Sequence, residues 1–294
     1  MSAQPLVTLG VPVYNGERFL RQCIDSLLHQ TFRDFRLVIS DNASTDRTRE
    51  IAESYVAADP RVAYRRHATN IGMYGNFDSL LRSAETKYVK LANADDYWSP
   101  DMLGDAVRQL ESDPSIALCY PRMTMVDADG KTTEKYGHGL HLIEDAPATR
   151  FRRVLTEIGL VNQLMGVIRC EAVRRSLPLL EHTLADRILV AELSLYGKIF
   201  QLDEYQYFRR FHEKSSSFNR GSDAHQIAYV YAQGTKGIGY KSWKYHYALM
   251  QRVGHSTLAT TKKARLLAFL LRGALWDRHS LLGDLVASTR QGTG

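Results

Sequence analysis

The sequence predicts an α/β fold in which a mostly parallel β-sheet is flanked by helices and followed by a helical C-terminal region. Within the first 128 of 294 residues, short apolar segments alternate with amphipathic segments five times. Such alternation is typical of βαβ units, whose strands run parallel and whose helices cover both sheet faces. Clusters of Asn, Asp, Gly and Ser follow the first four strands, at the edge where such folds bind ligands.

Each strand of this first zone is expected where a short run of apolar residues is bounded by polar ones. These runs are residues 6–14, 35–40, 61–67, 87–92 and 116–123. Each helix is expected where apolar residues recur at helical spacing or where a capping residue or a proline opens the segment. These segments are residues 17–31, the part of 41–59 that follows the cap Asp46, 75–85, and 100–113, which begins at Pro100.

The strict alternation ends at the turn-like segment DADGK, residues 127–131. Beyond it we expect a helix near 150–157, a strand near 164–170, a helix at 186–197, and a pair of strands at 198–202 and 205–211. Residues 223–294 are expected to be wholly helical. No low-complexity linker separates the zones, so we expect them to share one compact body.

Several classes of protein are disfavoured by what the sequence lacks. No run of about 18 uncharged apolar residues occurs, and the N-terminus does not resemble a secretory signal, which predicts a soluble cytoplasmic protein. The cysteines Cys23, Cys119 and Cys170 are widely spaced, so buried free thiols are expected rather than disulfides or a zinc site. Neither a P-loop nor a G-x-G-x-x-G turn follows the first strand, which disfavours ATPases and dinucleotide-dependent dehydrogenases.

The net charge of +6 is concentrated toward the C-terminus, because residues 224–276 contain eight Lys or Arg and no Asp or Glu. This distribution predicts an anionic partner. The segment 262–286 has an apolar face with basic flanks, and three outcomes stay open: packing on the domain, contact with a second subunit in a homo-oligomer, or binding to an anionic membrane. Residues 236–276 would then contact the inner face of the cytoplasmic membrane peripherally. No nucleic-acid-binding motif accompanies the charge, so nucleic acid is not an expected partner.

The polar loops after the first four strands, residues 12–17, 40–46, 69–76 and 93–96, predict a single cleft. Asp95 and Asp96 are adjacent carboxylates that repel each other at the edge of a buried element, and a divalent cation would remove that conflict. The alternative is that Asp96 simply caps the following helix.

Four of these motifs in order resemble the N-terminal half of the family 2 nucleotide-sugar glycosyltransferases, which have the Rossmann-like GT-A fold. They are VTLGVPVYNGERFL, LVISDNASTDRT, NIGMYGN and KLANADDYWSPDML. The resemblance implies a nucleotide-sugar-binding half in residues 1–128 and an acceptor-binding, catalytic-base half of the same domain in 129–222. Residues 223–294 would form a basic helical extension.

The resemblance also implies roles for individual residues. The nucleotide-binding residues it implies are Pro12, Val13, Tyr14, Glu17, Asp41, Asn70, Gly72, Asn93, Ala94 and Asp95. The family's D-x-D signature reads Asn93-Ala94-Asp95 here, so Mn²⁺ or Mg²⁺ would bind through Asp95, with Asp96 and His212 as further ligands. Arg210 and His212 would bind phosphate, although a solvated basic turn is the alternative there.

The family's catalytic base matches Asp186, with Ala185 in place of the preceding Glu. The alternative is that Asp186 is only a first-turn acid favoured by the helix dipole. The function implied is inverting transfer of a sugar from a nucleoside diphosphate to a hydroxyl of a glycan or lipid-linked glycan, in cell-surface polysaccharide or glycolipid biosynthesis. UDP is the expected carrier, with GDP and dTDP open.

Two other functions remain open. A degenerate nucleotide-sugar-binding protein is suggested by Asn93 and Ala185. A sugar nucleotidyltransferase would need a Gly-rich triphosphate loop after the first strand, and residues 12–17, PVYNGE, are not one.

Overall fold

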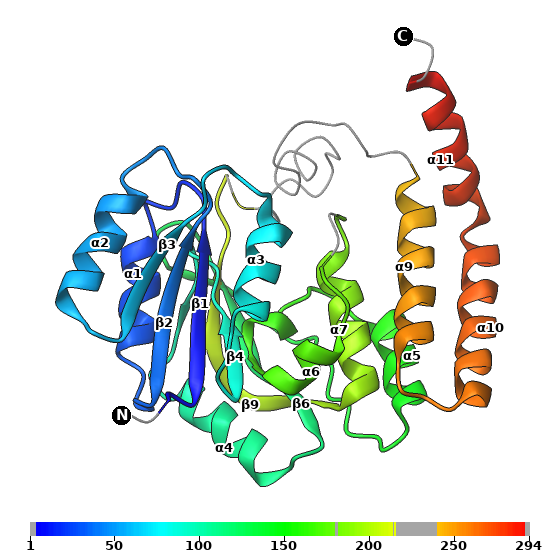
Figure 1. Cartoon of the computed structure of the whole chain (residues 1–294), viewed down its shortest axis with the longest axis horizontal. Coiled ribbons are helices and arrows are strands. Elements are labelled where there is room, and N and C mark those ends of the chain that lie inside the picture. The colour runs from blue at the N-terminus through cyan, green and yellow to red at the C-terminus, as the bar shows by residue number, and fades with distance from the viewer. Residues whose placement is uncertain (1–3, 180–181, 214, 216–239, 292–294) are drawn as a thin grey trace.

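The structure is a computed structural model that describes residues 4–179, 182–213, 215 and 240–291. Figure 1 shows a curled sheet with helices packed on its faces and a separate layer of helices at one side. The strands are β1 Val7–Val13, β2 Phe35–Asp41, β3 Val62–Arg66, β4 Tyr88–Leu91, β5 Tyr97–Trp98, β6 Ile116–Val126, β7 Thr132–Tyr136, β8 Val167–Arg169 and β9 Lys198–Arg210.

The helices cover the sheet and build the layer beside it. They are α1 Leu20–Leu28, α2 Thr48–Ala58, α3 Met73–Arg82, α4 Met102–Ser112, α5 Pro147–Glu157, α6 Cys170–Arg175, α7 Ala185–Tyr196, α9 Lys241–His255, α10 Thr260–Trp276 and α11 Arg278–Gln291, with a 3₁₀ turn at Gln163–Met165. The five strands and four helices expected in the first zone are all present. Of the expected C-terminal helical region, residues 223–239 lie outside the described residues.

The sheet is mostly parallel, as expected. Within the described residues its order is β3-β2-β1-β4-β8-β6-β9-β5, with β7 paired to β6. β8 runs antiparallel to both of its neighbours, β4 and β6, whereas β6 and β9 pair in parallel. The second zone therefore supplies strands to the middle and far side of the sheet, which is why its pattern no longer alternates strand and helix.

Two features of the strands differ from the expectation. The expected pair of strands at 198–202 and 205–211 is one strand, β9, whose register against β6 shifts between the pairs Tyr120–Gln201 and Arg122–Tyr205. The polar residues Asp203 and Glu204 sit in this irregularity instead of a hairpin turn. β5 and β7 are short edge elements that periodicity did not predict, because two to five residues are too few to show a pattern.

The core is formed by the central strands and the helix faces that cover them. β1 is buried along all of its residues, as expected of a strand covered on both faces. Cys23, Cys119 and Cys170 are buried free thiols, as predicted. Among the described residues, the helices are each too short or too polar to cross a lipid bilayer.

The C-terminal helices are attached to the sheet domain through a buried ion pair. Arg252 on α9 lies 3.4 Å from Glu192 on α7, measured between Nε and Oε2, and donates from Nη2 to the carbonyl oxygen of Pro178 at 2.7 Å. Burial raises the pKa of Glu192 to about 7, although the Arg252 charge acts in the opposite direction. Removing either partner would leave the other charge buried without compensation.

We expect Arg252→Ala to lower the free energy of unfolding by about 3–5 kcal/mol, because it strands the Glu192 carboxylate in a buried site. Urea titration followed by circular dichroism would measure the loss. The matched control is Arg272→Ala on the exposed surface of α10, which should change stability by less than about 0.5 kcal/mol. Equal losses in the two variants would contradict a special role for the buried pair.

Candidate active site

The order of the sheet positions a crevice between β1 and β4. Strands β3, β2 and β1 follow one another on one side, and β4 lies on the other side of β1, so the connections diverge at this point. Ligands of such sheets bind at the carboxyl ends of the diverging strands. A cavity of about 760 Å³ lies there. Its lining includes these predicted residues: Pro12, Val13, Tyr14, Glu17, Asn70, Asn93, Ala94, Asp95 and His212.

One wall of this cavity is preformed, because the loops after β1 and β2 are hydrogen-bonded to each other. The backbone N–H of Gly16 donates to Oγ1 of Thr48 at 2.9 Å, and that of Glu17 donates to Oδ2 of Asp46 at 3.0 Å. In return, the Glu17 carboxylate accepts from the backbone N–H of Arg47 at 3.1 Å. The start of α2 therefore holds the loop that lines the cavity.

Asp41 and Gly72 lie behind the cavity rather than on its surface. The Asp41 carboxylate is fully buried and accepts hydrogen bonds from the Ser44 N–H, the Tyr64 hydroxyl and the Arg66 guanidinium, at 2.6 to 2.8 Å. Burial would raise the pKa of Asp41, but these hydrogen bonds outweigh it and the pKa is lowered. Gly72 precedes α3 with φ of 78°, a conformation that favours glycine, and its carbonyl accepts from Asn42.

Asp96 is a buried carboxylate that lines the site. Its Oδ2 accepts from the Tyr207 hydroxyl at 2.6 Å and from Nδ2 of Asn93 at 3.0 Å, while Oδ1 accepts from the backbone N–H of Arg210 at 2.8 Å. Burial, with the charge of Asp95 beside it, raises the pKa of Asp96 to about 7. Three donors on a buried carboxylate favour a structural link between the loop after β4 and strand β9 over direct metal binding.

Asp95 and His212 face the open cavity together. The Asp95 side chain is 26% exposed, and its Oδ2 lies 3.2 Å from Nε2 of His212. The His212 ring packs on the Phe19 ring, with centroids 4.9 Å apart. One carboxylate and one imidazole beside open space fit a divalent cation whose other ligands come from substrate phosphates. Within the described residues no group of three or more acidic, His or Cys side chains is gathered as a self-sufficient metal site.

Arg210 is occupied by protein groups. Its guanidinium donates to the backbone carbonyls of Asp95, Asp127 and Ala128 and to Oε1 of Gln22, at 2.5 to 3.1 Å. It also lies 4.5 Å from the Phe19 ring centroid. Only a small part of its donor capacity therefore remains for a phosphate, and its evident effect is to hold the loop after β4, the turn after β6 and helix α1 together.

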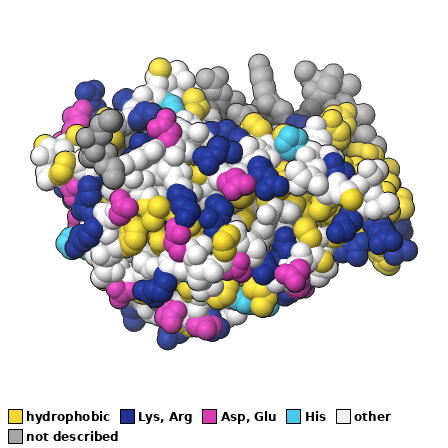
Figure 2. Space-filling model, turned by 60° about the horizontal axis from the view of Figure 1, so that its bottom comes forward, with side chains coloured by type: hydrophobic (Ala, Val, Ile, Leu, Met, Phe, Trp, Pro, Cys, Tyr) yellow, Lys and Arg dark blue, Asp and Glu magenta, His cyan; other side chains and the backbone are white. Residues whose placement is uncertain are grey.

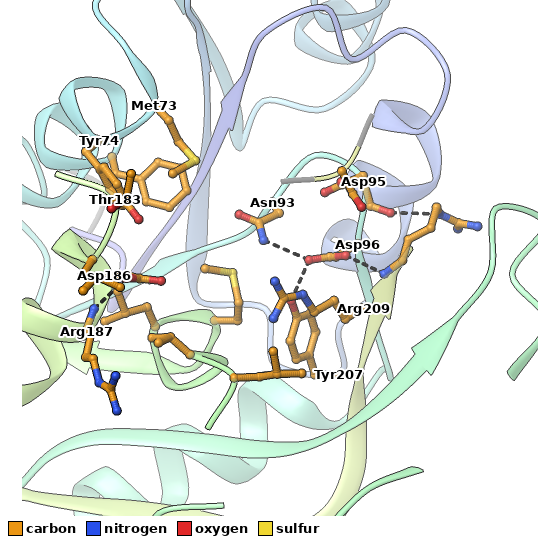
Figure 3. A pocket seen from close by; sticks show the side chains of 18 of the residues that line it. Met73, Tyr74, Asn93, Asp95, Asp96, Thr183, Asp186, Arg187, Tyr207 and Arg209 are labelled. Carbon is orange, nitrogen blue, oxygen red and sulfur yellow. Dashed lines mark hydrogen bonds between the residues drawn. The ribbon is translucent and has the colours of Figure 1, made fainter. Parts of the chain in front are cut away.

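A second cavity of about 260 Å³ adjoins the first and brings Asp186 to the site. Both cavities are lined by Met73, Phe77, Asn93 and Asp95. Figure 3 shows the Asp186 and Asp96 side chains on opposite sides of the second cavity, with the Arg209 side chain between them in this view. Residues from the loop after β4, from α7 and from β9 thus meet in one place.

Asp186 occupies the first turn of α7, where its Oδ1 accepts from the backbone N–H of Arg187 at 2.7 Å. Burial raises the pKa of Asp186, opposed by this hydrogen bond and by the charge of Arg209. A carboxylate with a raised pKa at the wall of a cavity has the properties of a general base. Within the described residues, Oγ1 of Thr183 and Nε of Arg187, which line the same cavity, are buried without a hydrogen-bond partner.

Arg209, Tyr207 and Phe19 also belong to the site, although no role was expected for them from the sequence. The signal for the first two was present, because residues 205–211 were expected to form a strand and side chains two apart in a strand share a face. Tyr207 and Arg209 both line the cavity that Asp186 lines. Phe19, which packs on His212 and Arg210 from just before α1, could not be identified, because nothing in its own segment indicates a partner nearly 200 residues away.

Comparison with known proteins gives a consistent assignment. Residues 8–177 match the model of glycosyl transferase family 2. The chain is 36% identical over 107 residues to an uncharacterized glycosyltransferase, EpsJ, of Bacillus subtilis, covering 36% of this chain and 31% of EpsJ. It is 29% identical over 126 residues to a chondroitin synthase of Escherichia coli, covering 43% and 18% of the two chains. The match therefore spans less than a third of either relative.

Solved structures resemble the chain over more of its length. TarS of S. aureus in complex with UDP-GlcNAc aligns with a TM-score of 0.65 at 18% identity, covering 90% of this chain and 71% of TarS. A mannosyltransferase of Pyrobaculum calidifontis, in complex with GDP-Man and Mn²⁺, aligns with a TM-score of 0.53 at 15% identity, covering 99% and 87%.

The family model covers more than half of the chain, and the solved structures share its sheet and helices. The sheet order, the crevice between β1 and β4 and the acidic loop after β4 agree with that match. The chain belongs to glycosyl transferase family 2 and has the GT-A fold.

Proposed function

We propose that this glycosyltransferase inverts the configuration of the sugar it transfers from a nucleoside diphosphate to a hydroxyl of a glycan or lipid-linked glycan. The observation that carries the proposal is the meeting of Asp95, His212 and Asp186 in adjoining cavities with a shared wall. The larger cavity suits a nucleotide, and the smaller one suits the sugar and the attacking hydroxyl. The chondroitin synthase among its relatives supports a role in polysaccharide or glycolipid synthesis.

The donor end of the reaction belongs to the larger cavity. We propose that residues 12–17 and Asn70 surround the base and ribose, while Asn93 contacts the ribose. Asp41 would orient the wall from behind through its hydrogen bonds to Ser44 and Tyr64. Asp95 and His212 would hold Mn²⁺ or Mg²⁺, which would supply positive charge to neutralise the leaving diphosphate. Complexes of similar proteins with UDP-GlcNAc and with GDP-Man and Mn²⁺ support this assignment. We propose UDP as the nucleotide carrier, with GDP and dTDP as the alternatives.

The acceptor end belongs to Asp186. A single displacement at the anomeric carbon inverts it, because the acceptor hydroxyl enters on the side opposite the leaving diphosphate. Asp186 takes the proton of that hydroxyl as the new bond forms. Transfer without Asp186 would leave the attacking oxygen protonated.

Arg209 is the cation that we propose for the phosphate role that the resemblance assigns to Arg210. Burial raises the pKa of both Asp96 and Asp186, and the charge of Arg209 opposes that rise at each; its side chain lines the cavity. Arg210 instead holds the surrounding loops through its carbonyl partners. A guanidinium near the leaving group stabilises the charge that develops there.

We expect Asp186→Asn to lower turnover by about 10²–10⁴-fold while nucleotide binding is retained, because the amide cannot accept the acceptor proton. Release of the nucleotide diphosphate during donor hydrolysis or transfer measures turnover. Asp186 must be unprotonated to act as a base, and its pKa is raised. As the pH is lowered, wild-type activity should therefore begin to fall at a higher pH than it would if the base were an exposed aspartate.

The matched control for this variant is Glu171→Gln, since Glu171 is the first-turn acid of α6 and lies outside both cavities. If Asp186 were only a first-turn acid, the two variants would behave alike. Unchanged turnover in Asp186→Asn would remove it from the mechanism, and full nucleotide binding without turnover in the wild type would favour the degenerate binding protein.

We expect UDP with Mn²⁺ to raise the melting temperature more than UDP alone, because binding to the folded state stabilises it by about 2.7 kcal/mol at a hundredfold excess over Kd. The assay is a thermal-shift panel of UDP, GDP, dTDP and CDP with and without Mn²⁺. Asp95→Ala and His212→Ala should each lose the manganese-dependent part, whereas Asp203→Ala, at a 91% exposed side chain, should keep it. A panel with no manganese-linked shift for any nucleotide would refute the metal role.

Replacing Arg209 and replacing Arg210 should have different effects, one mainly on turnover and the other mainly on stability. We expect Arg210→Gln to lower the free energy of unfolding by about 2–4 kcal/mol, since it leaves buried carbonyls unpaired. We expect Arg209→Gln to cost less stability than Arg210→Gln but to lower turnover by at least about tenfold. Parallel urea titrations and turnover assays measure both, and the reverse pattern would restore Arg210 as the phosphate ligand.

A further inference from the structure

The outermost helix of the C-terminal layer carries an apolar stripe that faces away from the protein. Ala264, Ala268, Leu271 and Leu275 recur at spacings of four, three and four along α10 and are all exposed, Leu271 by 55% and Leu275 by 69%. The buried residues of α10, Leu266 and Leu270, lie on the opposite side of the helix. We call the four exposed residues the α10 stripe.

Two further large apolar side chains of the C-terminal layer are exposed. Trp276 is 79% exposed, and Leu282 on α11 is 56% exposed. Monomeric soluble proteins seldom expose apolar side chains of this size together, and a patch that does so marks a site of contact. The stripe lies away from both cavities, so the function proposed above does not use it.

Basic side chains border the α10 stripe. Arg265 and Arg272 lie along one flank of the stripe and are exposed, and Lys262 in the first turn of α10 and Arg278 at the start of α11 are exposed basic residues of the same layer. At the right-hand edge of Figure 2, dark blue basic side chains lie beside hydrophobic ones in the C-terminal layer. An apolar face with a basic border is typical of helices that lie in the interface of an anionic bilayer. The apolar face is buried at the boundary of the acyl chains, and the Lys and Arg side chains pair with the lipid headgroups.

The acidic residues of the layer argue against a second copy as the occupant. Between residues 240 and 284 the acids are Asp277 and Asp284. Asp277 lies 3.2 Å from Nε2 of His246, and Asp284 accepts from the backbone N–H of Ser242 at 2.6 Å, so both make contacts with α9. A symmetric dimer through this face would bring Arg265 and Arg272 of both copies together without an acidic counterpart.

We propose that the α10 stripe and its basic border dock this protein on an anionic phospholipid bilayer. The aromatic residues Trp243 and Tyr247 on α9, 46% and 63% exposed, extend the same layer with side chains that suit the membrane interface. Nucleic acid would pair with the Lys and Arg side chains but would leave Leu271, Leu275 and Trp276 in water. The proposal does not depend on the reaction assigned to the cavities. Lys236, in the expected membrane-contact segment 236–276, lies outside the described residues.

The test is flotation of the full chain with vesicles of phosphatidylcholine alone and of phosphatidylcholine with about one third phosphatidylglycerol. We expect flotation with the anionic vesicles, much less with the neutral ones, and release at about 0.5 M salt, where the Debye length is short. Leu271→Glu/Leu275→Glu should lower the bound fraction by at least about tenfold, and Arg265→Gln/Arg272→Gln should lower it only for anionic vesicles.

The matched control is Val56→Glu, which places the same charge at an exposed apolar residue of α2 and should bind as the wild type does. Thermal unfolding and donor hydrolysis should be unchanged in the Leu271/Leu275 variant, because both side chains are exposed and outside the cavities. Wild-type protein that stays with neither kind of vesicle, or a variant that floats equally well, would overturn the proposal. Two other results would also overturn it if the wild type did not bind vesicles. One is a dimer in light scattering that Leu271→Glu/Leu275→Glu abolishes, and the other is binding to duplex DNA that the same variant abolishes.

Discussion

The site depends on one buried carboxylate, that of Asp96. It accepts from Asn93 on its own loop and from Tyr207 and the Arg210 backbone on β9, so segments more than 100 residues apart are joined at one side chain. This link sets His212, two residues beyond β9, beside Asp95. Its burial raises its pKa to about 7, which makes it a poor competitor for a cation and leaves the exposed partner, Asp95, to face the cavity.

The same link gives a physical reason for the asparagine at position 93. A carboxylate there would add a third negative charge against Asp96 in a buried setting, whereas the amide donates to it. Below the loop, Lys90 is fully buried in β4 and donates to the carbonyl of Met165 at 2.7 Å, and burial lowers its pKa to about 7. The loop after β4 therefore rests on a base of low dielectric constant, which strengthens each of its hydrogen bonds.

The C-terminal layer is built on a different principle from the site. Inside, α9 is attached to α7 by the buried pair of Glu192 and Arg252, and α10 packs outside it. Outside, α10 presents leucines and arginines to solvent rather than a polar surface. A helix layer that is firmly attached on one side and apolar on the other can hold the sheet domain at a surface while its cavities stay open to donor and acceptor.

The sequence by itself determined the α/β architecture, the first-zone elements and the composition of the polar crevice, because these depend on local periodicity and on loops that directly follow strands. Only the tertiary structure decided that Asp96 is enclosed, that Arg210 holds loops while Arg209 faces the cavity, and that Phe19 supports His212. Those outcomes rest on contacts between segments far apart in the chain, which no local pattern encodes. The position of β8 between β4 and β6 also could not be predicted locally, because strand pairing depends on how all the strands and helices pack together.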